Sequence, residues 1–256
     1  MRGSKIGLLI LSTSNKRDHW KNMKDTYFYN LTLKTFLLSQ DKEHSYVFYI
    51  GIDEGDRIFD NPGQQNEVYK FSKVFKNVEF KFIKMDGIPK GHVTIMWNRL
   101  FKQAFDEMCD YFYQCGDDIN FKTNGWINDC ILTLNKNKDI GLTGPVNNNH
   151  MILTQAFVSR KHMMIFGWFF PEQIVNWCCD DWYNDVYKPD NFHPLKQHFC
   201  SNDGGEPRYV IANKKDFKGK NITDFKTNVD KLRLDTSNMA EQHKQLIVKY
   251  IKKWNP

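Results

Sequence analysis

Apolar residues in this chain fall into short uninterrupted runs, separated by segments in which they recur with helical spacing. The runs, rich in aliphatic and aromatic residues, predict buried strands. They are Lys5–Ser12, Ser45–Asp53, Val78–Met85, Tyr111–Cys115 and Ile140–Gly144. The segments between them predict helices at Asp25–Ser39, Asn66–Phe75, Thr94–Met108 and Gly125–Asn135.

This alternation of strands and helices predicts an α/β fold with a largely parallel central sheet and helices on both faces. In such sheets, ligands bind beyond the carboxyl ends of the strands. Polar clusters follow three of the predicted strands, at Ser12–Arg17, Asp53–Asp56 and Gly116–Asp118. We therefore expect these clusters to share one edge of the sheet and to form a binding site there.

The chain changes character after Asp216, where large aliphatic residues become scarce and charges frequent. The residues from Asp216 to Asp235 predict an extended or loop connection. A helix is expected after it, with Thr236 or Ser237 as its N-cap and Lys252 and Lys253 in its last turn. The predicted organisation is one domain over residues 1–215, and a C-terminal extension over 216–256 that ends in this helix and packs on the domain.

Composition narrows the possible partners. The 256 residues are 41% hydrophobic, which allows one sizeable core. The net charge of +6 comes mainly from scattered lysines, so a nucleic-acid groove is not indicated, whereas a small anionic ligand such as a nucleotide is compatible.

No apolar run is long enough to span a bilayer. Six cysteines without a CxxC pair suggest reduced thiols, and we expect a cytoplasmic protein. Nothing in the sequence indicates an oligomeric state.

Two neighbouring carboxylates, Asp117 and Asp118, follow Gly116 at the end of a predicted buried strand. Like charges this close repel one another, and a divalent cation would offset that cost. Carboxylates bind hard cations such as Mg²⁺ or Mn²⁺. Adjacent residues of an extended strand point to opposite faces, so either the chain turns at Gly116 or only one acid binds metal. We expect Asp118 to be the direct ligand. A plain polar turn remains an alternative.

A second acidic pair, Asp180 and Asp181, lies among aromatic residues. Apolar neighbours raise the pKa of a carboxyl group, which suits a general base. Acids at the start of a helix are the alternative interpretation. The chain has no GxxxxGK[ST] loop and no GxSxG elbow, so neither P-loop phosphate chemistry nor the usual acyl-transfer site is indicated. A two-metal phosphoesterase or nuclease stays open, although it would require more clustered acids or histidines.

The order of several short motifs resembles that of GT-A-type glycosyltransferases, in particular the small soluble enzymes of large DNA viruses that infect algae and protists. The motifs include "ILSTSNKRD", "YIGIDEGD", "GHVTIMWNRLFKQAF", "YFYQCGDDINF" and "NDGGEPRYVI". The likeness extends over Lys5–Ala212 and leaves out the C-terminal tail. It implies a Rossmann-like GT-A domain and, if the protein is viral, a location in the host cytoplasm.

The resemblance also implies roles for individual residues. Thr13, Ser14 and Arg17 would line the nucleotide base and diphosphate, and Asp53 would accept a hydrogen bond from the base. Positions over the sugar and phosphate would be taken by Lys90, His92 and Asn98. Gly116, Asp117 and Asp118 stand where this family has its DXD motif, so the first acid is replaced by glycine. Asp118 would hold the metal, Asp117 would face a ribose hydroxyl or a metal-bound water, and His198 is the candidate third metal ligand.

The expected activity is metal-dependent transfer of a hexose or deoxyhexose from a nucleoside-diphosphate donor to an acceptor hydroxyl. We expect UDP as the nucleotide, Mn²⁺ or Mg²⁺ as the metal, and a glycan or glycoprotein as the acceptor. The cation would neutralise charge on the departing diphosphate. Asp181, or alternatively Asp180, would deprotonate the acceptor and invert the anomeric centre.

Trp168 and Phe170 are candidates for stacking on the sugar, with core packing as the alternative, and Asn148 is a candidate contact for the acceptor. The donor sugar is not determined by the sequence. A non-catalytic carbohydrate-binding protein on a transferase fold remains a further alternative.

Overall fold

The computed structural model describes residues 3–205, Tyr209 and residues 225–254. Eight strands form one sheet in the order β3-β2-β1-β4-β7-β6-β8-β5. Their bounds are β1 Lys5–Ser12, β2 Ser45–Ile52, β3 Val78–Lys84, β4 Tyr111–Gly116, β5 Ile119–Phe121, β6 Leu142–Val146, β7 Ala156–Ser159 and β8 Phe192–Asn202. Each of the five strands expected from the sequence is present.

The predicted α/β class with a mostly parallel sheet is confirmed. Strands β3, β2, β1 and β4 are parallel neighbours, and β6 pairs in parallel with β8. β7 pairs antiparallel with both β4 and β6, and β5 pairs antiparallel with β8. The carboxyl ends of the parallel strands β1, β2 and β4 therefore meet at one edge of the sheet.

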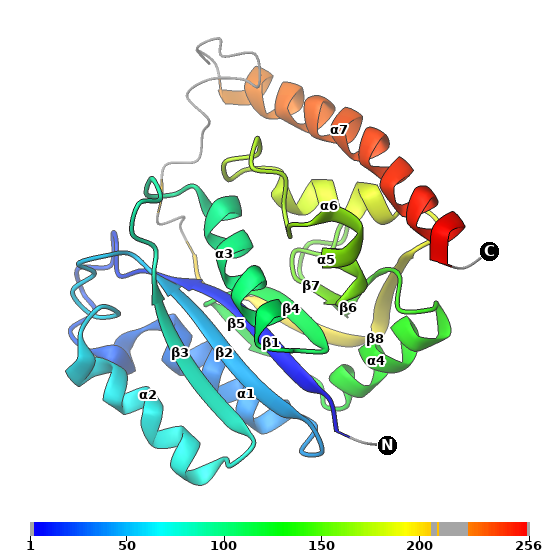
Figure 1. The fold of residues 1–256 in the computed structure, drawn as a ribbon. Coiled ribbons are helices and arrows are strands. Elements are labelled where there is room, and N and C mark those ends of the chain that lie inside the picture. The colour runs from blue at the N-terminus through cyan, green and yellow to red at the C-terminus, as the bar shows by residue number, and fades with distance from the viewer. Residues whose placement is uncertain (1–2, 206–208, 210–224, 255–256) are drawn as a thin grey trace.

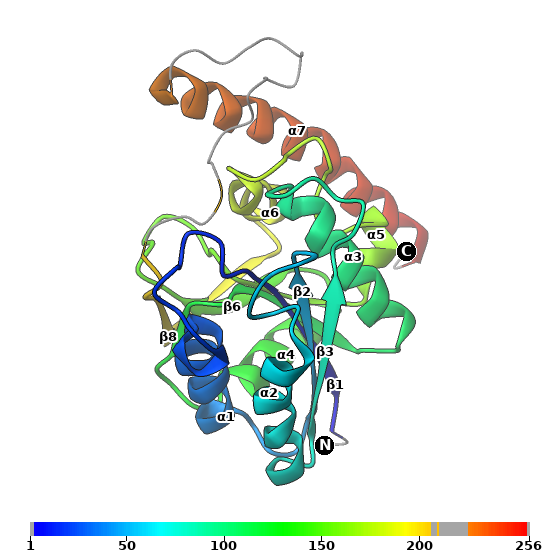
Figure 2. The same ribbon diagram turned by 90° about the vertical axis from the view of Figure 1, so that its left-hand side faces the viewer.

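Helices cover both faces of the sheet (Figures 1 and 2). Their bounds are η1 Met23–Asp25, η2 Phe28–Leu33, α1 Lys34–Ser39, α2 Pro62–Val74, α3 Val93–Asp106, α4 Trp126–Lys136, α5 Lys161–Phe166, α6 Cys179–Tyr187 and α7 Phe225–Trp254. One apolar core lies between the sheet and α1, α2 and α4, and a second lies between the sheet and α3, α5, α6 and α7. Alternate residues of β1, such as Leu8 and Leu9, enter the two cores.

The C-terminal helix starts earlier than the sequence predicts. α7 runs from Phe225 to Trp254 and packs on α5 and α6, as both ribbon views show. The predicted N-cap at Thr236 or Ser237 is wrong, because both residues lie inside the helix. Thr236 is buried, and the Ser237 hydroxyl donates a hydrogen bond of 2.6 Å to Asp185 of α6. The predicted domain boundary at 215/216 lies outside the described residues. Among the helices that are described, none is long and apolar enough to cross a membrane.

Candidate active site

Three adjoining cavities follow the sheet edge at which β1 and β4 end. The rim pocket, about 230 Å³, is lined by Ser12, Thr13, Gly116 and Asp118 among others. The helix pocket, about 260 Å³, is lined by Gln114 and by the first turn of α6. The loop groove, about 940 Å³, follows residues 147–155. Trp97 lines all three, so the cavities adjoin one another at this residue, and together they are called the cleft.

The polar clusters that follow β1 and β2 come together at this edge. Thr13 Oγ1 lies 2.9 Å from Asp53 Oδ2 and 3.0 Å from Asp56 Oδ2. The Tyr209 hydroxyl donates to Asp53 Oδ2 at 2.6 Å. Thr13 and Tyr209 both line the rim pocket, so the buried Asp53 carboxylate lies directly behind its wall.

Asp56 organises the loop that follows β1. Its carboxylate accepts hydrogen bonds from Ser14 N at 2.6 Å, Ser14 Oγ at 2.9 Å and the Thr13 hydroxyl. On its other side it accepts from the backbone N–H groups of Ile58 and Phe59 at 3.0 and 2.9 Å. Ser14 is consequently buried and directed to Asp56, and it does not line the rim pocket.

Arg17 lies behind the rim pocket instead of lining it. Its side chain is buried, donates to the carbonyl of Gly204 at 3.3 Å, and has its guanidinium 5.7 Å from the centre of the Tyr27 ring. Arg17 therefore contacts the loop that follows β8. The same loop is joined to Asp118, because Asp203 N donates a hydrogen bond to the Asp118 backbone carbonyl. Its expected contact with a diphosphate remains a prediction.

Asp118, but not Asp117, reaches the cleft. Asp117 is fully buried, whereas Asp118 is partly exposed in the rim pocket, as expected if only one acid of the pair binds a ligand. The Asp118 carboxylate lies between two glycines: a Cβ atom at Gly116 would overlap its Oδ1, and one at Gly204 would overlap its Oδ2 and Cγ. The absence of a side chain at Gly116 therefore leaves the space that this carboxylate occupies.

A preformed protein cage for a metal is not present in the part of the chain that the structure describes, where no three His, Cys, Asp or Glu side chains cluster suitably. His198 does not line the rim pocket. Its Nε2 lies 2.8 Å from Asp129 and its Nδ1 3.1 Å from Thr123. The geometry therefore does not support His198 as a third metal ligand. Asp118 alone could still bind a cation whose remaining ligands are diphosphate oxygens, an arrangement that is common for Mg²⁺.

Asp180 and Asp181 lie in the first turn of α6, which begins at Cys179. The preceding residue, Cys178, has a φ of 70°, in the left-handed region. Burial raises the pKa of Asp180 to about 7, and the neighbouring Asp181 charge adds to this. Burial also raises the pKa of Asp181, but Arg233 opposes that rise. Asp180 lines both the helix pocket and the loop groove, while Asp181 lines the helix pocket.

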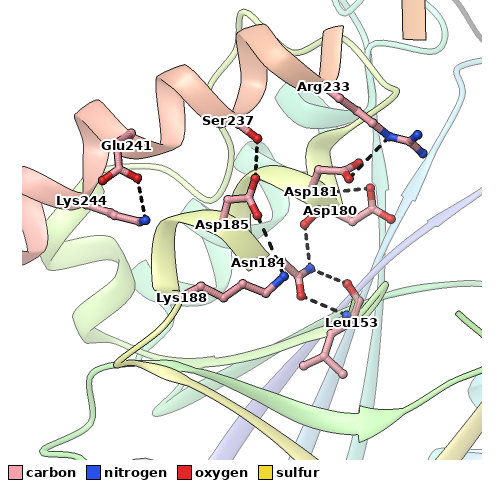
Figure 3. A network of polar contacts seen from close by, with 10 residues as sticks. All are labelled: Leu153, Asp180, Asp181, Asn184, Asp185, Lys188, Arg233, Ser237, Glu241 and Lys244. Atoms are coloured by element: carbon pink, nitrogen blue, oxygen red, sulfur yellow. Dashed lines mark hydrogen bonds and ion pairs between the residues drawn. The ribbon is translucent and has the colours of Figure 1, made fainter. Parts of the chain in front are cut away.

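Helix α7 contributes directly to this part of the cleft (Figure 3). Arg233 extends from α7, its Nε 3.8 Å from Asp181 Oδ1, and it also lines the helix pocket. Beneath the pair, the Asn184 side chain joins α6 to Leu153: Nδ2 donates to the carbonyls of Leu153 and Asp180 at 2.7 and 2.8 Å, and Oδ1 accepts from Leu153 N. The turn that carries Asp180 is therefore fixed to the 147–155 loop.

Three residues expected over the sugar and phosphate have other surroundings. Asn98 holds the backbone of Phe169 and Phe170, donating to one carbonyl and accepting from both N–H groups, and it lines a cavity on a different face of α3. His92 precedes α3, with its Nε2 3.0 Å from the carbonyl of Glu172. Lys90 is exposed in the turn before it. None of the three lines the rim pocket.

The two aromatic residues expected to stack on a sugar do not line the cleft. Phe170 is fully buried in the core against Tyr183, and Trp168 packs between Phe166, Trp182 and His243 of α7. The core-packing alternative therefore describes Phe170, because it is fully buried and lines none of the three cavities. The rim pocket is instead lined by three aromatic residues that the sequence did not single out: Trp97, Trp177 and Tyr209.

Asn148 lies on the loop groove. Its side-chain amide makes two hydrogen bonds to the backbone of Asn202, at 2.9 and 3.1 Å, and so ties the 147–155 loop to the end of β8. The expected acceptor contact remains a prediction. Gln114, Asn176 and Trp177 were missed as well. The sequence did contain an indication for Gln114, because a polar amide inside a buried aromatic strand is unusual.

The fold described above, an eight-stranded mixed sheet with a C-terminal helix, is that of solved glycosyltransferase structures. It matches S. aureus TarS 1–349 in complex with UDP-GlcNAc, at 11% identity and a TM-score of 0.56, covering 97% of this chain and 73% of that one. The complex of TarS 1–349 with UDP gives 11% identity, a TM-score of 0.54, and 97% and 72% coverage.

A longer TarS structure matches at 10% identity and a TM-score of 0.50 over 76% of this chain, which spans 36% of that protein. At such identities the likeness is one of fold. No protein-family profile and no curated protein matches the chain, and nothing in these comparisons bears on the resemblance to viral enzymes.

Proposed function

We propose that this protein is a glycosyltransferase that moves a sugar from a UDP-linked donor to an acceptor hydroxyl, with inversion. One observation carries the proposal: Asp180, with its pKa raised to about 7, and Asp118 line the same cleft. Solved structures of the same fold bind UDP and UDP-GlcNAc, which supports a uridine nucleotide as the donor.

The donor diphosphate would lie in the rim pocket, beside Asp118 and Thr13. Asp118 would hold a divalent cation together with the diphosphate oxygens, and that cation would neutralise the negative charge of the leaving UDP. Asp53, directly behind this pocket, would accept a hydrogen bond from the base, and Trp97, Trp177 and Tyr209 provide apolar surface around the donor.

The acceptor would approach along the loop groove, where Asn148 and the rest of the 147–155 loop present polar side chains. Asp180 faces this groove and would take the proton of the acceptor hydroxyl. The acceptor oxygen then forms a bond to the anomeric carbon, and the bond from that carbon to the phosphate oxygen breaks with its electron pair leaving on UDP. A base with a pKa of about 7 is half ionised at neutral pH.

Of the two acids, Asp180 is the better base. Asp181 faces Arg233, which favours its ionised form and makes it a poorer proton acceptor. The alternative of a two-metal phosphoesterase receives no support, since the residues described by the structure do not cluster into even one three-ligand metal group.

Calorimetry with UDP, with and without Mn²⁺, tests the donor site. We expect UDP affinity to rise at least about tenfold with Mn²⁺ and this rise to be lost in Asp118→Ala. Asp190→Ala, which removes an exposed acid outside the cleft, is the matched control. UDP affinity that is indifferent to Mn²⁺ would reject the metal-assisted donor site, and UDP release equal in wild type and Asp180→Asn would reject the assigned base.

A further inference from the structure

Gln114 places a polar side chain in the middle of an apolar sheet face. It lies on β4 between Phe112 and Gly116, in register with Leu9 of β1 and Ala156 of β7. The side chain is 3% exposed, and its Oε1 has no hydrogen-bond partner among the described residues. Buried amide oxygens are nearly always paired in folded proteins, so this one requires an explanation.

Tyr183 presents a second unpartnered polar atom in the same place. It lies one turn after Asp180 on α6, so both side chains are on one side of the helix. The residue is 1% exposed, its ring packs against Phe170, and its hydroxyl has no partner within the described structure. Both Tyr183 and Gln114 line the helix pocket together with Asp180.

The position of the helix pocket identifies its occupant. It shares Trp97, Asn176 and Trp177 with the rim pocket, where the diphosphate would bind, and it contains the base Asp180. In an inverting displacement the transferred sugar must lie between the leaving diphosphate and the base. A sugar hydroxyl can donate to an amide oxygen and exchange a hydrogen bond with a phenol, which are the two groups that lack partners here.

We propose that Gln114 and Tyr183 bind hydroxyl groups of the transferred sugar and so determine which donor the enzyme accepts. This inference rests on the proposed function, because it requires a nucleotide sugar in the cleft. It assigns to each residue one contact that UDP alone cannot make. The affinity for the sugar part of the donor should therefore depend on both residues, and the affinity for UDP should not.

The test compares UDP with UDP-glucose, in the presence of Mn²⁺, on the full chain. Gln114→Met and Tyr183→Phe keep the shape of each side chain and remove its free polar group. We expect each variant to bind UDP like the wild type and UDP-glucose about 5- to 10-fold more weakly. Gln173→Met and Tyr69→Phe, at exposed positions, are the controls and should change neither affinity.

A second measurement needs only the wild type. Within a set of monodeoxy UDP-glucose analogues, at least one should bind about tenfold more weakly than UDP-glucose, and Tyr183→Phe or Gln114→Met should remove that difference. If the wild type does not bind UDP at all, the proposed function itself fails. If UDP binds but the variants keep the wild-type ratio of UDP-glucose to UDP affinity, or gain thermal stability with that ratio unchanged, the inference is overturned and the function stands.

Discussion

On the β1–β2 side of the cleft, the acidic groups are supplied with hydrogen bonds by the chain itself. Asp56 accepts from Thr13, Ser14 and two further backbone N–H groups, and Asp53 from Thr13 and Tyr209. On the α6 side, burial raises the pKa of Asp180 to about 7, and polar atoms of Gln114 and Tyr183, which line the same pocket, have no partner in the described structure.

The difference is what the proposed transferase activity would need. The side to which we assign nucleotide binding would gain from rigidity, and its carboxylates contribute to stability because they are satisfied. The side to which we assign proton transfer keeps polar groups without protein partners, which would be available to a ligand, at a cost to the stability of the folded protein. Replacing an acid on one side should therefore have the opposite effect on stability from replacing an acid on the other. The expected effects below run from the largest to the smallest.

Asp180→Asn should lower the rate of sugar transfer by about 10²- to 10⁴-fold, because it removes the base. It should also stabilise the protein at pH 8, by about 1–3 kcal/mol, which is less than the full pKa shift implies because the side chain is partly exposed. The pKa of Asp180 is about 7 in the folded state and near 4 in the unfolded state, so folding favours its protonated form. Wild-type stability therefore falls as pH rises from about 4 to 7.

Thermal unfolding of wild type and Asp180→Asn at pH 5 and pH 8 measures this, with Asp190→Asn as a control at an exposed position. The advantage of Asp180→Asn should be larger at pH 8. The wild-type transfer rate should rise with pH to a plateau above about pH 7. A destabilised Asp180→Asn at pH 8 would mean that this acid is satisfied like those of the opposite side.

Asp56→Ala should destabilise the protein by about 2–3 kcal/mol, since it leaves the N–H groups of Ser14, Ile58 and Phe59 without their acceptor. Chemical denaturation measures the free energy of unfolding. Glu54→Ala, an exposed acid of the same loop, is the control and should change it by less than about 0.5 kcal/mol. Equal losses of unfolding free energy in both variants would show that the hydrogen bonds of Asp56 do not stabilise this side of the cleft.

Gly204→Ala should reduce the Mn²⁺-dependent gain in UDP affinity by about tenfold, because the new methyl group would displace the Asp118 carboxylate. The φ of Gly204 lies outside the left-handed region, so the substitution adds volume and no backbone strain of that kind. Calorimetry with and without Mn²⁺ gives the measurement, and Gly63→Ala, at the start of α2, is the control. An unaltered gain would show that Asp118 does not need its present position.

Arg233→Ala should have the smallest effect, lowering stability by less than about 1 kcal/mol. The Arg233 side chain is 55% exposed, and its Nε lies 3.8 Å from Asp181. Loss of the guanidinium should raise the pKa of Asp181, because that charge favours the ionised acid. Denaturation of Arg233→Ala beside Lys249→Ala, an exposed position of α7, measures the change. A loss of several kcal/mol would show that α7 depends on this contact.

The amino-acid sequence by itself determined five of the eight strands, most helices and the class of fold, because hydrophobic periodicity is a local property that each of these elements carries. It did not predict β5, β7 and β8. It also placed Asp118 just after a strand end, and the start of a helix was one of its two interpretations of Asp180 and Asp181, which lie in the first turn of α6. Only the tertiary structure decided which side chains reach the cleft. Phe170 is buried in the core, and Asn98 and His198 form hydrogen bonds with other residues. The residues that line the helix pocket with Asp180 include Trp97, Gln114 and Tyr183. The reason is physical: burial and unpaired polar atoms arise from contacts between segments far apart in sequence, and periodicity contains no information about those contacts.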